Sequence, residues 1–305
     1  MKNHLLSFSI VSLAILLISA GLPSRLEKAY EALTIYDYFK AKDLFYKSLK
    51  NDSVAASYGL SIIYSRSDNP FTQIDSAHKY INISQEKWTV VDVDSRLDCS
   101  SVGVDSLSIS DQAYAVDSLA FLRAELINEI DAWDEFIDGF DNAAFRTKAV
   151  ENRNEMVFGL AKAENTSMAF STFLTSYPNA AQAGEAAKFY ESRNFEERTA
   201  GNTQQGYQTF LDSFPTSPYA PDADERIYNM ATTGGKAEDY LSFIQTVPRV
   251  PFRDLAGRRI YASEVKEVNA ESIADFTLSY PDYPFMRELK QESELAVTRF
   301  YPITD

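Results

Sequence analysis

The chain has 305 residues, of which 45% are hydrophobic, so it is long enough to bury a substantial core. It carries 29 Lys and Arg against 44 Asp and Glu, and its net charge of −15 argues against partners rich in phosphate, nucleic acid above all. One cysteine and two histidines exclude an internal disulfide and a histidine-rich zinc site.

The N-terminus has the form of a secretory signal. Lys2 precedes an apolar run over residues 5–18, and Ser19, Ala20 and Gly21 are small enough for cleavage. The run is short for a membrane span. We therefore expect residues 1–20 to be a signal peptide and the mature protein to be exported to the periplasm or cell envelope, without stable membrane insertion. An uncleaved membrane anchor is the alternative.

Residues 22–87 show two related helical patterns. Ala41, Phe45 and Ser48 share one helix face, and Ala77, Ile81 and Ser84 repeat that spacing 36 residues later. Between them lie the large–small pair Tyr58-Gly59 and a turn signal at 68–70. This block resembles degenerate tetratricopeptide repeats, although the tryptophan and the proline of that family's consensus are missing. The resemblance implies paired antiparallel helices.

Residues 88–110 are rich in Ser, Asp and Val and have no long helical period. They predict an irregular connector, with or without a short helix, and a boundary between subdomains. Cys99 falls in this segment, where it is either a buried thiol or one linked to a partner. A helix is then expected over 111–128, with Ala115, Leu119, Leu122 and Leu126 on its apolar side.

A nine-residue phrase occurs five times after that helix. The copies occupy 133–141, 170–178, 207–215, 240–248 and 273–281, and their last residues are 37, 37, 33 and 33 positions apart. Apolar residues recur at i, i+3, i+4 and i+7, which predicts a helix, and the final residue is usually a proline, which ends it. The aromatic residues expected in the core are Trp133, Phe136, Phe173, Phe210, Phe243 and Phe276.

The residues around each phrase complete a hairpin. Pro218, Pro251 and Pro284 follow the phrase by three positions and suit the first turn of a second helix. Thr166 and Thr203, each preceded by Asn, can cap the phrase helices. Residues 111–305 therefore predict five helical-hairpin repeats, and the whole mature chain an all-α solenoid, a superhelix of the tetratricopeptide type.

The phrase is similar to the tetratricopeptide-like repeats of bacterial envelope proteins, such as the TolA-binding coordinator and outer-membrane-assembly lipoproteins. This resemblance implies a scaffold that binds a protein or peptide in a groove. Within the fourth repeat lies a basic cluster, for which we expect a part in binding an acidic peptide or polysaccharide; a solvated helix face is the alternative. Its members are Arg249, Arg253, Arg258, Arg259 and Lys266.

Catalytic patterns are weak. The sequence has no nucleophile elbow and no glycine-rich phosphate loop, and His78 is separated from Cys99 by the expected connector. An acidic run lacks the spacing of a calcium loop and predicts a helix exterior; it comprises Glu125, Glu129, Asp131, Asp134, Glu135 and Asp138.

Ser53 and Ser106 lie in Asp-Ser-apolar motifs that resemble glycosylation sites of some envelope proteins, and both are expected in loops. The sequence leaves such a modification undecided.

The prediction is thus a non-catalytic scaffold without cofactor or metal, which binds a protein or peptide partner and no nucleic acid. A structural arm of a larger assembly is the first alternative, and a carbohydrate-processing enzyme with paired carboxylates the second. The sequence leaves the oligomeric state and the partner's identity open.

Overall fold

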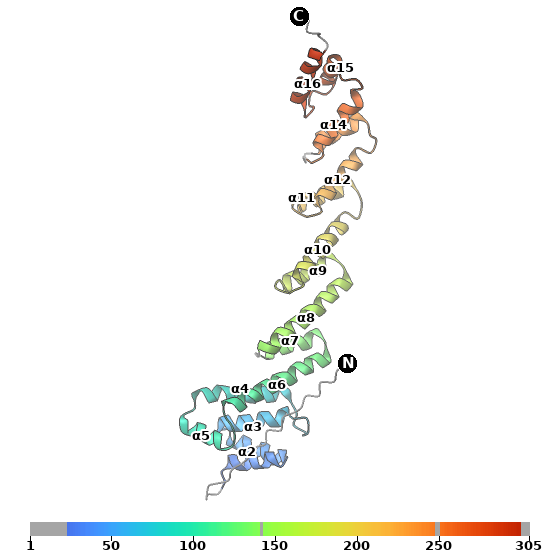
Figure 1. Ribbon diagram of the computed structural model, residues 1–305. Coiled ribbons are helices and arrows are strands. Elements are labelled where there is room, and N and C mark those ends of the chain that lie inside the picture. The colour runs from blue at the N-terminus through green and yellow to red at the C-terminus, as the bar shows by residue number, and fades with distance from the viewer. Residues whose placement is uncertain (1–22, 141–142, 248–250, 300–305) are drawn as a thin grey trace, which may run out of the picture. The chain divides into compact units, whose positions relative to one another are not determined.

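The computed structural model describes residues 23–140, 143–247 and 251–299, which form sixteen α-helices and no strand (Figure 1). The predicted all-α class is confirmed. The chain divides into two compact units, Met1–Val157 and Phe158–Asp305. The expected signal peptide, residues 1–20, lies outside the described residues.

Four helices build the first block of the first unit. They are α1 (Arg25–Thr34), α2 (Tyr38–Ser48), α3 (Ser53–Ser65) and α4 (Ile74–Val90). Helix α1 packs on α2, α2 on α3, and α3 on α4. The residues that repeat in the sequence are those that point inward: Ala41, Phe45 and Ser48 on α2, and Ala77, Ile81 and Ser84 on α4. Helix α3 is the centre, with nine of its thirteen residues buried.

Residues 88–110 are not an irregular connector. They include the end of α4, the whole of α5 (Val93–Ser101) and the start of α6 (Ser106–Ile127). Cys99, Val102 and Val104 are buried in the same core as α1 and α3. The boundary expected here was wrong, since α6 packs on α3 and α4 and the chain divides into its two units between Val157 and Phe158.

The two serine motifs mark helix starts and not loops. Ser53 and Ser106 are the first residues of α3 and α6, and an aspartate occupies the cap position before each. The side chain of Asp105 accepts a hydrogen bond from the backbone N–H of Ser108, which satisfies a free donor of the first turn.

The apolar side expected for α6 was also wrong. The buried residues of this helix include Ile109, Ala113, Val116, Ala120 and Ala124, and the small side chains among them allow close packing. The leucines of the expected side point elsewhere, since Leu122 is 43% exposed and Leu126 is 88% exposed.

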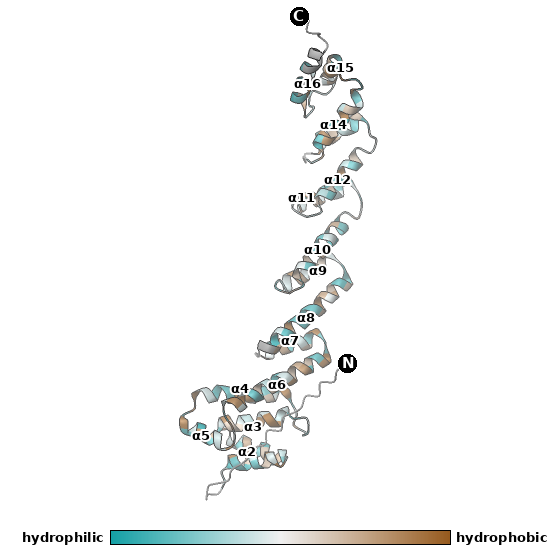
Figure 2. Cartoon of the chain, viewed as in Figure 1, coloured by the Kyte–Doolittle hydropathy of each residue, from teal (hydrophilic) through white to brown (hydrophobic). Residues whose placement is uncertain are grey.

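Each phrase forms the first helix of a hairpin, and all five phrase helices are ten residues long. They are α7 (Ile130–Gly139), α9 (Ser167–Ser176), α11 (Gln204–Ser213), α13 (Ala237–Thr246) and α15 (Ala270–Ser279). Their partners are α8 (Ala143–Glu164), α10 (Ala183–Arg198), α12 (Ala220–Ala231), α14 (Arg253–Glu264) and α16 (Met286–Arg299). Figure 2 shows hydrophobic (brown) and hydrophilic (teal) residues interspersed along these helices.

The five copies of the phrase share one geometry, which depends on the phenylalanine and the last two residues. In every copy the residue that ends the helix donates its backbone N–H to the carbonyl of the repeated phenylalanine, as Phe214 does to Phe210 at 2.8 Å. A proline then follows in the described copies 178, 215 and 281, and it holds its predecessor out of the helical conformation. All six aromatic residues expected in the core are at most 3% exposed.

The predicted helix caps are present, but the prolines lie outside the helices in which they were expected. Thr166 and Thr203 accept hydrogen bonds from the backbone of Ala169 and Gly206, and thus cap α9 and α11. Pro218 and Pro284, however, lie two residues before α12 and α16, in the turn and not in the helix. The carbonyl of Ser217 bonds the N–H of Ala220, so this tight turn comes before the helix can begin.

Candidate partner-binding surfaces

The described residues of the basic cluster have different neighbours. Arg249 lies outside the described residues. The guanidinium of Arg258 lies over the ring of Phe285, with 5.5 Å between the guanidinium carbon and the ring centroid. Arg259 lies beside Tyr228 of α12; burial raises the pKa of that tyrosine, and the arginine opposes the shift.

The other two described residues of the cluster, Arg253 and Lys266, have different surroundings from Arg258 and Arg259. Lys266 is exposed just beyond the end of α14. Arg253 is the first residue of α14 and borders an open hollow. The structure therefore distinguishes Arg253 from its neighbours.

This hollow has a volume of about 470 Å³ and lies where two successive repeats meet. Its lining comes from α13, the start of α14 and the turn between α15 and α16: Leu241, Ile244, Gln245, Arg253, Pro281, Asp282 and Tyr283. Ile244 and Tyr283 are buried and form an apolar floor, whereas Gln245, Arg253 and Asp282 are exposed. Apolar and polar side chains both line this open hollow, so it can contact both kinds of group on a partner.

Arg253 differs from its counterparts in the two neighbouring repeats. The corresponding residue, two positions after the turn proline, is Ala220 in the preceding repeat and Met286 in the following one; the first repeat has Arg146 there, after Ala144 in place of the proline. A cation in the first turn of a helix opposes the helix dipole, so α14 itself gains nothing from it.

The histidine and the cysteine do not form a catalytic pair. His78 on α4 lies with its Nε2 3.8 Å from Oδ1 of Asp117 on α6, and its ring is 4.3 Å from that of Phe140. Cys99 is buried on α5, close to Ala55 of α3, and burial raises the pKa of its thiol. Of the two fates left open for Cys99, the described residues show burial.

The acidic run is distributed over α6 and α7. Asp134 pairs with Arg153 at 2.9 Å, and the other five carboxylates of the run are exposed. Within residues 23–140, 143–247 and 251–299, no group of three or more His, Cys, Asp or Glu side chains is arranged to hold a metal ion.

A surface of α2 was missed by the sequence reasoning. Tyr36 is 62% exposed and Phe39 is 69% exposed, and Tyr46 lies two turns after Phe39 on the same side of the helix. Lys40, Lys42 and Lys47 belong to the same helix, and Lys47 is paired with Asp43 at 2.6 Å. We call these six residues the aromatic–lysine face. The available signal was a second pair of aromatic residues in α2, set apart from its buried stripe.

Neighbouring elements hold this face in place. The ring of Phe71 meets that of Phe39 edge to face at 4.8 Å, and the ammonium of Lys42 is 3.8 Å from the centroid of Phe71. The hydroxyls of Tyr46 and Tyr64 are 2.7 Å apart. Edge-to-face rings and cations over rings are favourable contacts, so the face is ordered before any partner arrives.

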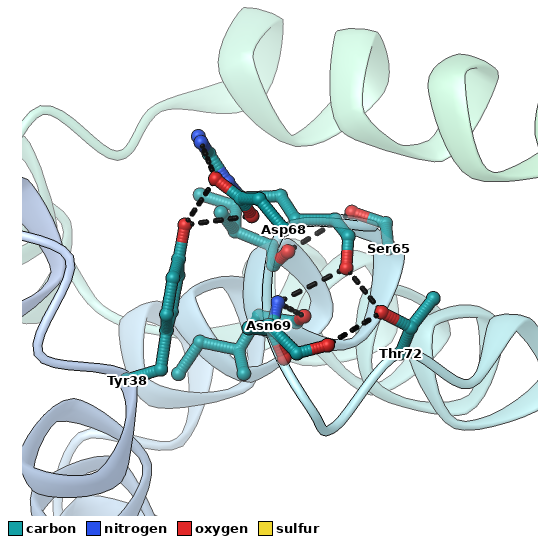
Figure 3. Close-up of polar contacts among 8 residues, drawn as sticks. Tyr38, Ser65, Asp68, Asn69 and Thr72 are labelled. Carbon is teal, nitrogen blue, oxygen red and sulfur yellow. Dashed lines mark hydrogen bonds and ion pairs between the residues drawn. The ribbon is translucent and has the colours of Figure 1, made fainter.

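The turn that carries Phe71 is built from internal hydrogen bonds (Figure 3). Arg66 donates two bonds to the carboxylate of Asp68, and the hydroxyl of Tyr38 donates a third at 2.8 Å. These bonds, that of Arg66 first, lower the pKa of Asp68 to about 2. Asn69 accepts a bond from the N–H of Phe71 and donates to the carbonyl of Ile63. These bonds satisfy the polar groups of the turn within the block itself.

Comparisons with known proteins supply no family. No family model matches the chain, and no curated protein matches it significantly. Among the described helices, none combines the length and the apolar character needed to cross a membrane.

Proposed function

We propose that the chain is a non-catalytic, exported scaffold of the bacterial cell envelope, whose stacked hairpins form a solenoid that holds a protein or peptide partner. The observation that supports this best is the hollow beside Arg253. It offers an apolar floor for one side chain and, around it, a guanidinium, a carboxylate and an amide. A peptide backbone supplies both donors and acceptors for such groups.

The chemistry of Arg253 favours this role over a structural one. A binding residue is expected to be exposed, to border the hollow and to be of no use to its own helix. Arg253 meets these conditions, whereas Arg258 and Arg259 lie against Phe285 and Tyr228. We therefore assign to Arg253 the contact with the partner, and not to the basic cluster as a whole.

Cross-linking in the native envelope tests the proposal. A photoreactive phenylalanine derivative at Gln245 of the hollow should capture one protein. The same derivative at Asp212, which has the same place in the preceding phrase, is the matched control and should capture none. Arg253→Glu should lower the yield by about tenfold or more, because it replaces an attraction with a repulsion.

Arg258→Glu is the matched control for charge. It makes the same change on the same helix, away from the hollow, and should leave the yield unchanged. Glutamate in the first turn suits the helix dipole, so Arg253→Glu does not weaken α14. Equal capture from Gln245 and Asp212, or equal loss in both arginine variants, would overturn the assignment.

A further inference from the structure

Two groups of aromatic rings lie along one side of α2. In the first, which we call the Phe39 group, the 69% exposed ring of Phe39 meets that of Phe71. In the second, the Tyr46 group, the ring of Tyr46 meets that of Tyr80 edge to face at 6.0 Å, and Tyr80 stacks on Tyr64 at 5.7 Å. Phe39 and Tyr46 are seven residues apart, so the groups are separated by about 10.5 Å along the helix. A partner that contacts both groups needs apolar side chains at this spacing.

The Tyr46 group has one hydroxyl hydrogen to spare. The hydroxyls of Tyr46 and Tyr64 are 2.7 Å apart, and that of Tyr80 donates to Tyr46 at 3.1 Å. Three phenols carry three O–H donors, and these two hydrogen bonds use two of them. Among the described residues, no acceptor outside the group is bonded to these hydroxyls. One donor is therefore left for a partner's oxygen atom.

Between the two groups, α2 presents a cation. The side chain of Lys42 follows Phe39 by one turn, and within the described part of the chain its ammonium pairs with no carboxylate. Two carboxylates of the same block are already engaged, since Asp43 is paired with Lys47 at 2.6 Å and Asp68 accepts two bonds from Arg66. This side of α2 thus offers donors to a partner, and the acceptors beside them are taken.

The charge of the α1–α2 hairpin points the same way. Residues 25–50 carry six Lys and Arg against four Asp and Glu, whereas the whole chain has a net charge of −15. An acidic partner therefore meets less repulsion at this hairpin than at a part of the surface with the average charge. The complementary partner has acceptors and negative charge, with apolar groups about 10 Å apart.

These requirements select one conformation of peptide. In a polyproline II helix every third residue returns to the same side after about 9.3 Å, close to the separation of the ring groups. Alternate residues of a β-strand are only about 6.7 Å apart. An α-helix reaches the spacing after seven residues, but its carbonyls are bonded internally and cannot accept the spare hydrogen. A polyproline II helix leaves its carbonyls free, and proline has no N–H that would need an acceptor.

We propose that this side of α2 binds a proline-rich peptide in the polyproline II conformation, with two prolines three residues apart and an acidic residue between them. One proline lies against the Phe39 group and the next against the Tyr46 group, while the carboxylate reaches Lys42. Aromatic surfaces are a recurring means of binding such peptides. A polysaccharide fits less well, because its hydroxyls donate as well as accept. The inference does not depend on the hollow beside Arg253, which belongs to the second unit.

Fluorescence anisotropy with labelled synthetic peptides and the full chain tests this inference. The probe consists of four repeats of Pro-Glu-Pro, which places prolines three residues apart throughout. Four repeats of Ala-Glu-Ala have the same length and charge, and they should bind about tenfold more weakly or worse, because the ring contacts are lost. Four repeats of Pro-Gln-Pro keep the prolines without the charge and should bind about threefold more weakly, since an exposed ion pair contributes little.

Substitutions in the chain locate the site. Phe39→Ala and Tyr46→Ala should each lower the affinity for the Pro-Glu-Pro peptide by about tenfold or more, because each removes the exposed ring of one group. Tyr114→Ala is the matched control, since this 55% exposed ring also contacts a neighbour, Phe145, but belongs to α6, which packs on α3, α4 and α7. It should leave the affinity unchanged, as should Arg253→Glu at the hollow. Circular dichroism checks that each variant is folded.

Three results would overturn the proposal. The first is a chain that binds cellohexaose, or neither probe, in place of the Pro-Glu-Pro peptide; the rings would then form a carbohydrate surface or a solvated face. The second is equal affinity for the Ala-Glu-Ala peptide, which would indicate attraction by charge alone. The third is a loss of affinity in Tyr114→Ala as large as that in Phe39→Ala, which would place the peptide elsewhere.

Discussion

In the first block, the tight packing of Gly59 against Phe45 predicts a large loss of stability from a small substitution. Gly59 of α3 faces the end of the Phe45 ring, and a Cβ at this position would run into that ring. The ring has no room to move, because Phe45 is fully buried and packs edge to face on Tyr30 at 4.9 Å. Overpacking costs about 1–3 kcal/mol and alanine gains about 0.5–1 kcal/mol in a helix, so Gly59→Ala should destabilise by about 1–2 kcal/mol.

A second glycine supplies a control of opposite sign. Gly159 of α8 is exposed, and no atom lies within 4 Å of the position that its Cβ would take. Gly159→Ala should therefore stabilise by about 0.5–1 kcal/mol. Urea unfolding followed by circular dichroism measures both variants. Fluorescence reports the first unit alone, since Trp88 and Trp133 are the only tryptophans of the chain.

Shortening the Phe45 side chain should restore the stability that Gly59→Ala removes. Phe45→Leu shortens the side chain that the new methyl group meets, so the double variant should be more stable than the sum of the single effects by about 1 kcal/mol or more. The reasoning would be refuted if Gly59→Ala stabilised the protein as Gly159→Ala is expected to do. It would also be refuted if the effects of Gly59→Ala and Phe45→Leu were simply additive.

Two further effects follow from the packing and the charges. Phe210→Ala should cost about 3–5 kcal/mol, because this ring is 1% exposed, and hydrogen exchange should rise most in α10–α13; Leu278→Ala, at an 81% exposed position, should cost less than about 0.5 kcal/mol. A uniform rise that included α1–α4 would contradict the separate units. Because the pKa of Asp68 is lowered to about 2, its contribution to stability is present above its ordinary value of 3.8 and is lost as the pH falls through about 2. Carboxyl shifts in NMR should show this midpoint and its return toward 3.8 in Arg66→Ala; a wild-type midpoint already near 3.8 would refute the role of the ion pair.

The sequence by itself determined the helices of the repeats and their inner faces. A phrase with one apolar residue per turn has only one side that can be buried, and a proline behind it fixes where the helix ends. For this reason the residues that repeat at the same spacing in the first block, such as Phe45 and Ile81, are those that the structure buries. Local chemistry also determined the caps at Thr166 and Thr203.

Tertiary structure alone decided which face of an ambiguous helix is buried and which side chains share a surface. Helix α6 offers leucines on one side and small residues on another, and the small ones are buried because they let α3, α4 and α7 approach. The basic residues of the fourth repeat are close in sequence but face different neighbours, because successive residues of a helix point about 100° apart. The aromatic–lysine face depends on Phe71, which reaches it from a turn 32 residues after Phe39. Periodicity along the chain reports one helix at a time, and such a surface exists only where elements distant in the sequence meet.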